Sequence, residues 1–189
     1  MHNTRSNTIV MLVSFFVLTA IANPGRAATA DTDLLQKLAR AGGLEKFPRA
    51  NIIFVEKRRD IKYEEDGTYL DRTYLLIKFL TEPAVSFFAT MPVLEYYSYR
   101  SEGKVLFARM IKPGGEISDV PAEMIADIIN PMYRDLNVKD TNMRLKQITF
   151  KNLQVGDAVE YAVEEKCIRP VSRAFELKEG KYLMTFSST

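Results

Sequence analysis

The feature that most constrains the fold is a change in the spacing of apolar residues near Asn51. From there onward, apolar and polar side chains alternate with a period of two, as they do along a strand whose two faces meet different environments. The clearest stretch is 68–80, where Leu75, Ile77 and Phe79 share one parity. The alternation predicts that most of the chain is built from β-strands.

Turn residues divide this region into many short segments. A hairpin is predicted at Glu65-Asp66-Gly67, and further turns at 101–103, 112–115, 155–157 and 179–181, each of which contains glycine. The strands expected besides 68–80 are 52–55, 85–90, 94–99, 104–111, 144–150, 157–167, 173–177 and 182–186. Many short strands with frequent turns are typical of an antiparallel β-sandwich, which we assign to residues 51–189 as one domain.

Two short helices are expected beside the strands. Residues 33–41 have leucines at helical spacing after the possible N-cap residues Asp31, Thr32 and Asp33, which predicts a short helix. We assign residues 31–50 to this helix and a linker. Residues 121–129 begin with a proline and carry isoleucines at helical spacing, which predicts a helix crossing between sheet edges.

Residues 1–30 have the pattern of a secretory signal peptide. Arg5 lies in a polar start, an apolar run of about fourteen residues follows, and cleavage after either Ala27 or Ala30 satisfies the preference for small residues. A membrane-spanning helix needs roughly twenty apolar residues, so an uncleaved anchor is the weaker alternative. We expect export to the periplasm or the exterior of a bacterium, with no stable membrane span after cleavage.

The charge and the rare residue types limit the possible chemistry. Loss of Arg5 and Arg26 with the signal would leave 24 basic and 24 acidic residues, and the one histidine would be lost too. Nucleic-acid binding needs a surplus of basic residues, so we expect no such partner. A single cysteine in an oxidising compartment cannot form an intrachain disulfide.

Several short motifs together resemble a known family. In order they are Tyr63-x-x-Asp66-Gly67, Ile77-Lys78-x-Leu80-Thr81-Glu82, Ala108-Arg109-x-Ile111-Lys112-Pro113-Gly114-Gly115-x-Ile117, Val120-Pro121 and Leu153-x-Val155-Gly156-Asp157-x-Val159-Glu160-Tyr161. Their order and spacing resemble an exported bacterial domain of unknown function that commonly precedes transglutaminase-like, papain-related domains. The resemblance covers about residues 51–166 and implies a β-sandwich accessory domain.

The resemblance brings no catalytic residue to this chain. In longer relatives a downstream domain carries the Cys, His and Asp of thiol acyl transfer, whereas this sequence ends at Thr189 without that domain. The chain is therefore expected to be either a stand-alone module or a part of a split or truncated enzyme. We expect no enzymatic activity and no cofactor.

Individual candidates for chemistry have simpler structural interpretations. Cys167 shares the parity of an apolar strand face and is expected to be a buried thiol, with an intermolecular disulfide and catalysis as alternatives. Neither Glu64-Glu65-Asp66 nor Asp31-Thr32-Asp33 is expected to bind calcium. Glu160 and Glu164, like the adjacent Glu165, are candidates for glycoside hydrolysis, but the first two lie opposite the apolar parity and are expected to face water.

One aromatic cluster is a candidate binding surface. Tyr96, Tyr97 and Tyr99, together with Phe87 and Phe88, would place at least half of their rings on an exposed strand face. Core filling is the preferred interpretation of these residues, and a binding surface is the alternative. The preferred function is a non-catalytic exported module that contacts another protein or a cell-envelope polymer, with carbohydrate binding through Tyr96 or Tyr97 as an alternative.

Overall fold

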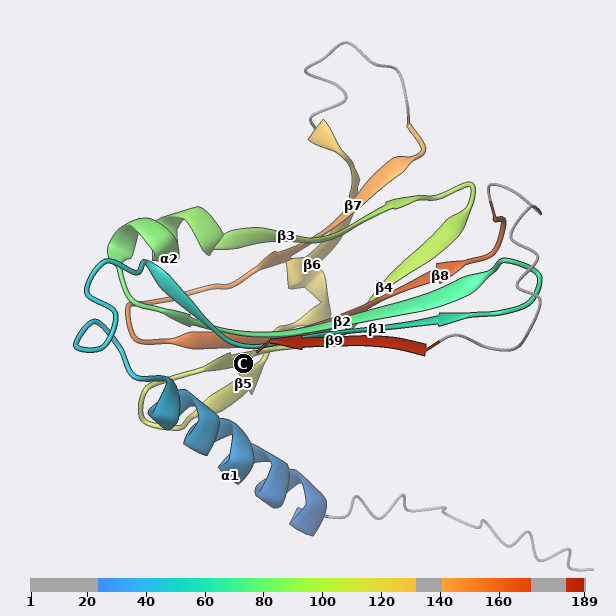
Figure 1. The fold of residues 1–189 in the computed structure, drawn as a ribbon. Helices are drawn as coiled ribbons and strands as arrows, with labels where there is room; N and C mark the ends of the chain where they lie inside the picture. Colours follow the sequence, from blue (N-terminus) through green and yellow to red (C-terminus); the bar gives the residue numbers. More distant parts are fainter. Residues whose placement is uncertain (1–23, 132–140, 171–182, 189) are drawn as a thin grey trace, which may run out of the picture.

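The computed structural model describes residues 24–131, 141–170 and 183–188, which form a mainly β fold with two antiparallel sheets (Figure 1). The six-stranded sheet has the order β5-β4-β8-β2-β1-β9, and the three-stranded sheet has the order β3-β7-β6. The elements are α1 (Pro24–Ala41), β1 (Ile52–Tyr63), β2 (Tyr69–Phe79), α2 (Glu82–Phe88), β3 (Thr90–Tyr97), β4 (Ser101–Ile111), β5 (Ile117–Asp119), η1 (Ala122–Met124), β6 (Ile125–Ile129), β7 (Met143–Thr149), β8 (Ala158–Cys167) and β9 (Leu183–Ser188).

The hairpin between β1 and β2 forms where the sequence predicts it. Gly67 has a φ of 84°, and Asp66 accepts hydrogen bonds from both the backbone N–H and the hydroxyl of Thr68. The hairpin pairs Tyr63 with Tyr69 and continues in register to Ile52, with one irregularity near Val55. The turn therefore sets which side chains of β1 and β2 share a face.

The main core lies between the two sheets. Alternate residues of β2 and β8 point toward the smaller sheet, including Ile77 and Val159, which are almost fully buried. Ile148 of β7 closes the core from the other side, and α2 adds Ala84 and Val85. Each strand of the central pair thus contributes every second residue to one apolar layer, as the sequence pattern predicts.

Helix α1 covers the opposite face of the six-stranded sheet (Figure 1), where Leu34 and Leu38 pack against Leu76, Ile111 and Ala158. The expected helix 33–41 is confirmed, but it begins earlier, at Pro24. Proline is well suited to a first helical position, and the alanine-rich segment after it favours continuation of the helix. The interpretation of residues 31–33 as a helix start is wrong, since they lie inside α1.

Three local predictions are wrong. Residues 85–90, expected as a strand, belong mostly to α2, which begins after Thr81 with a proline in its first turn. Residues 121–129, expected as a helix, form the short η1 and then β6, because Ile125 and Ile128 fit a strand paired with β7. Residues 101–103, expected as a turn, begin β4, and the turn lies at 98–100.

The other predictions fall into two groups. The remaining expected strands within the described residues are found with shifted ends, and β5 was not expected. The apolar run of the proposed signal, the expected strand 173–177 and the expected turn 179–181 lie outside the described residues. No helix in the described part of the chain is long and apolar enough to cross a membrane.

Candidate functional site

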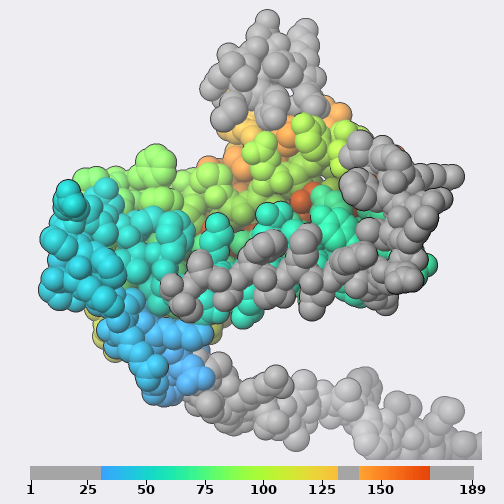
Figure 2. Space-filling model, in the orientation of Figure 1, coloured from blue at the N-terminus to red at the C-terminus, as the bar shows by residue number. Residues whose placement is uncertain are grey.

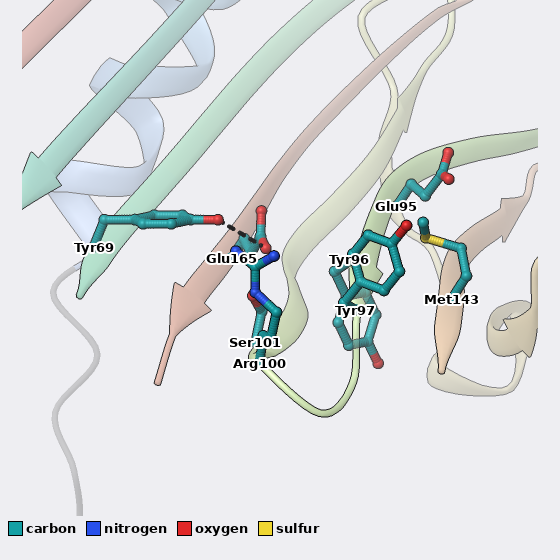
Figure 3. Close-up of a pocket in the computed structure, with 8 residues that line it drawn as sticks. All are labelled: Tyr69, Glu95, Tyr96, Tyr97, Arg100, Ser101, Met143 and Glu165. Carbon is teal, nitrogen blue, oxygen red and sulfur yellow. Dashed lines mark hydrogen bonds between the residues drawn. The ribbon is translucent and has the colours of Figure 1, made fainter. Parts of the chain in front are cut away.

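The candidate site is a cleft of about 370 Å³, which we call the tyrosine cleft. It lies where β3 passes over the start of β2 and the end of β8, and residues of both sheets line it (Figure 3). Figure 2 shows the molecule with all its atoms from the side seen in Figure 1. The lining residues are Tyr69, Glu95, Tyr96, Tyr97, Arg100, Ser101, Met143 and Glu165. In the part of the chain that the structure describes, β3 is an edge strand, because it pairs with β7 alone.

Tyr96 forms a fixed wall of the cleft. Its ring packs so closely over Gly103 that a Cβ added to that glycine would lie 2.6 Å from a ring carbon of Tyr96. Only 7% of Tyr96 is exposed, and its hydroxyl donates a 2.8 Å hydrogen bond to Asp127. Burial and this carboxylate raise the pKa of Tyr96 to about 12. Position 103 in β4 therefore requires glycine because the Tyr96 ring lies so close to it, and not because the chain turns there.

The predicted aromatic cluster is divided between two places. Tyr97 lines the cleft and is half-buried, and Tyr99 is exposed beside it, with the two rings 5.7 Å apart at 67°. Phe87 and Phe88 lie instead on α2, where Phe88 packs against Phe79 of the core. A strand at 85–90, as predicted, would have brought the two phenylalanines and the tyrosines together on a sheet. Helix α2 forms there instead and keeps the phenylalanines apart from the tyrosines.

Tyr69 and Glu165 form the opposite wall, and sequence reasoning missed the first of them. The Tyr69 hydroxyl donates a 3.2 Å hydrogen bond to Glu165 (Figure 3). Burial and the nearby Glu165 carboxylate raise the pKa of Tyr69 to about 12. The phenol therefore stays protonated at neutral pH and remains a donor to Glu165. In the sequence, Tyr69 has no signal beyond its place in the alternating stretch 68–80.

Cys167 lies beneath this wall and is a buried free thiol, 1% exposed. It is paired in register with Tyr69 on one side and Ser101 on the other, at the last position of β8. This is the location that the strand parity predicts. A thiol so far from solvent is not placed to attack a dissolved substrate.

The prediction that Glu160 and Glu164 face water is wrong, because they are 5% and 9% exposed. Glu160 accepts hydrogen bonds from the Tyr74 hydroxyl at 2.8 Å and from Arg109 Nε at 2.7 Å. Glu164 accepts one from Arg72 at 2.8 Å. Helix α1 covers the face on which Glu160 lies, and Arg109 also pairs with Asp31 of that helix. These carboxylates are held by structural ion pairs.

The two acidic segments considered for calcium have other contacts. Asp66 receives the Thr68 hydrogen bonds of the hairpin turn, which lower its pKa. Asp31 pairs with Arg109. Among the described residues, no group of three or more His, Cys, Asp or Glu side chains is arranged to hold a metal ion.

Two of the motifs behind the family resemblance, at 108–117 and 153–161, meet near α1, away from the tyrosine cleft. Asp157 is 1% exposed and accepts a 2.7 Å hydrogen bond from Lys112 and a 2.8 Å bond from the Gln154 N–H. Lys112 also donates to the Asn152 carbonyl at 3.0 Å. Gly115, with a φ of 91°, places its turn against Leu35 of α1. These residues join two turns and a helix, which is a structural role.

Comparisons with known proteins give one similarity of fold. No family model matches the chain, and no curated protein matches it. Its fold is similar to part of the crystal structure of a "putative protease" from Parabacteroides distasonis, with a TM-score of 0.51 and 13% identity over 57% of this chain. This chain covers 21% of the length of that protein. At this identity the similarity concerns the fold alone.

Proposed function

We propose that this chain is a non-catalytic, exported β-sandwich module that binds a peptide segment of a partner in the tyrosine cleft. The observation that carries the proposal is the position of β3, an edge strand that forms one wall of a cleft lined by tyrosines. An edge strand offers free backbone groups to an extended peptide, and pockets beside it select side chains. Tyrosine and methionine suit such a surface, because they combine apolar contact with a polar or adaptable end.

The chemistry of the described residues supports a binding role over a catalytic one. Cys167 is buried, and the chain's single histidine, His2, lies in the proposed signal. Glu160 and Glu164 are held by arginines on the face away from the cleft. A nucleophile requires a base within hydrogen-bond reach, and an acid–base pair requires carboxylates that converge on one bond.

A second candidate is an accessory role beside a papain-related catalytic domain made separately. It draws support from the similarity to a protein named a putative protease, of which this chain would match only a small part. The family resemblance in the motifs points the same way. Binding of peptides in the tyrosine cleft is compatible with that role, since an accessory domain of a protease could hold part of its substrate.

Carbohydrate binding is supported less well by the geometry. Stacking of a sugar needs an exposed and flat aromatic face. Tyr96 is covered, and the Tyr97 and Tyr99 rings meet nearly edge to face.

The proposal is tested by selecting peptides from a library of random 12-residue sequences on the purified full-length chain. We expect binders whose affinity falls at least tenfold in Tyr97→Ala and is unchanged in Phe87→Ala, which removes an exposed ring outside the cleft. Absence of binders, or binders that ignore Tyr97→Ala, would contradict the proposal. Turnover of peptide, acyl or glycoside substrates by the purified chain would contradict its non-catalytic part.

A further inference from the structure

Arg100 is the one described residue with a buried side-chain nitrogen or oxygen that lacks a hydrogen-bond partner, and this atom is its Nε. The residue lies in the turn between β3 and β4 and lines the tyrosine cleft (Figure 3). A buried donor without a partner costs roughly 1–3 kcal/mol, and in a native protein it calls for an explanation such as a bound water or ligand.

The backbone holds Arg100 firmly in place. Its N–H donates to the Tyr97 carbonyl at 2.9 Å, and its own carbonyl accepts from Ile168 at 2.7 Å and from Arg169 at 3.1 Å. These bonds join the turn to the chain that follows β8. The guanidinium is therefore presented from a fixed anchor, so that less freedom is lost when it binds a ligand.

Arg100 also differs from other arginines of the fold. Arg59, Arg72, Arg109 and Arg144 each pair with a carboxylate. None of the ion pairs among the described residues includes Arg100, although Glu95 and Glu165 line the same cleft. The cleft thus holds an unpaired cation and two carboxylates at separate points of its wall.

From this arrangement we infer that the tyrosine cleft binds a peptide that carries both a carboxylate and an ammonium group. The inference rests on the proposed function and specifies its ligand. The guanidinium of Arg100 would receive the carboxylate, because its planar donors match that group in a two-point hydrogen bond. Glu165 would receive the ammonium group, since Tyr69 occupies only one of its oxygens.

The charges that line the cleft favour this ligand over one that carries a single kind of charge. A purely anionic ligand would meet Arg100 but would be repelled by Glu95 and Glu165, and a purely cationic ligand would leave Arg100 without a partner. A volume of about 370 Å³ is at the small end of ligand pockets, which span roughly 300–1,000 Å³. The bound part is therefore expected to be one or two residues long.

The test measures binding of N-acetyl-lysyl-alanine to the purified full-length chain by calorimetry. Two related probes each lack one charge: the C-terminal amide has no carboxylate, and the peptide acetylated on its lysine side chain has no ammonium group. We expect each change to weaken binding to the wild-type chain at least tenfold. Equal affinity for the peptide and either related probe would overturn the inference without any variant being needed.

Variants assign each charge to its partner. Arg100→Gln should remove the preference for the free carboxylate over the amide, and Glu165→Gln should remove the preference for the free ammonium group. Lys151→Gln removes an exposed charge outside the cleft and should keep both preferences. Arg100→Lys keeps the charge but not the planar donors, and should reduce the carboxylate preference only in part.

The outcomes separate this inference from the proposed function. If the random library yields peptides that depend on Tyr97 while all three small probes bind equally, the inference is wrong and the peptide-binding role stands. If neither the library nor the probes bind, both are wrong. Retention of the carboxylate preference by Arg100→Gln would show that another group receives the carboxylate.

Discussion

The space between the two sheets is apolar where β8 begins and polar where β8 ends. Val159 and Glu165 lie on the same face of this one strand, yet Val159 is fully buried in the core and Glu165 lines the tyrosine cleft. The residues of β2 paired with them follow the same change, from Ile77 to Asp71, and Tyr69 lies two positions further along the same strand. A continuous apolar layer would serve stability alone. The change in side-chain chemistry along β8 separates the half of the sandwich that stabilises the fold from the half proposed to bind.

The largest effect is expected from Phe79→Ala at the apolar end. Phe79 is fully buried and its ring lies 5.7 Å from that of Phe88, so truncation should lower the free energy of unfolding by about 3–5 kcal/mol. Urea denaturation measures this change. Phe87→Ala, at a ring that is 77% exposed, is the control and should cost less than about 1 kcal/mol. Equal losses in the two variants would mean that this end is not the stabilising core.

The two carboxylates Glu160 and Glu165 sharpen the comparison on one strand. Glu160→Gln removes the charge facing Arg109 in a covered site and should cost about 2 kcal/mol, less than complete removal because an amide still accepts from Tyr74. Glu165→Gln should change stability by less than about 0.5 kcal/mol, since no cation pairs with Glu165 among the described residues. Chemical denaturation of both variants measures the difference. A larger loss in Glu165→Gln would contradict the separation of stabilising and binding ends.

Gly103→Ala is expected to have a smaller effect, at the boundary of the cleft. The new methyl group would meet the Tyr96 ring, and the resulting shift should cost about 1–2 kcal/mol and change the shape of the cleft wall. Gly114→Ala is the matched control, because a Cβ at Gly114 meets nothing within 4 Å. Thermal unfolding compares the two variants. If both are neutral, Tyr96 is free to move and is not a fixed wall.

The sequence predicts most of the strands, but it does not predict which residues come together to line the cleft. Alternation located β2 and β8 because a sheet with different neighbours on its two faces requires a period of two. It failed at residues 85–88, where a run of apolar residues fits a strand or a helix, and Thr81 and the proline after Glu82 were the overlooked helix-start residues.

The site itself depends on geometry that periodicity does not contain. Tyr69, Arg100 and Glu165 come from three segments that are far apart in the sequence. Tyr69 and Glu165 meet because β2 pairs with β8, and Arg100 joins them because its carbonyl accepts hydrogen bonds from the chain after β8. The alternating pattern also led to the wrong prediction that Glu160 faces water. Alternation distinguishes the two faces of a strand but does not indicate what covers each face. In the fold, α1 and Arg109 cover that face.

The smallest predicted effect concerns Tyr69 at alkaline pH. The fold raises the pKa of this phenol to about 12 from an ordinary value near 10, so the folded state keeps its proton longer than the unfolded chain does. The associated stability is fully present below pH 10 and is lost as the pH rises toward 12. Tyr69→Phe should therefore lose less stability than the wild-type chain between pH 9 and 11.5, by at most about 1 kcal/mol because the ring is partly solvated.

Urea midpoints at the two pH values measure this difference, and the other tyrosines with raised pKa values are the same in both proteins. An identical decline in both would mean that Tyr69 is no more shielded than a phenol in water, and the cleft wall that it forms with Glu165 would have to be looser than the rest of the sandwich.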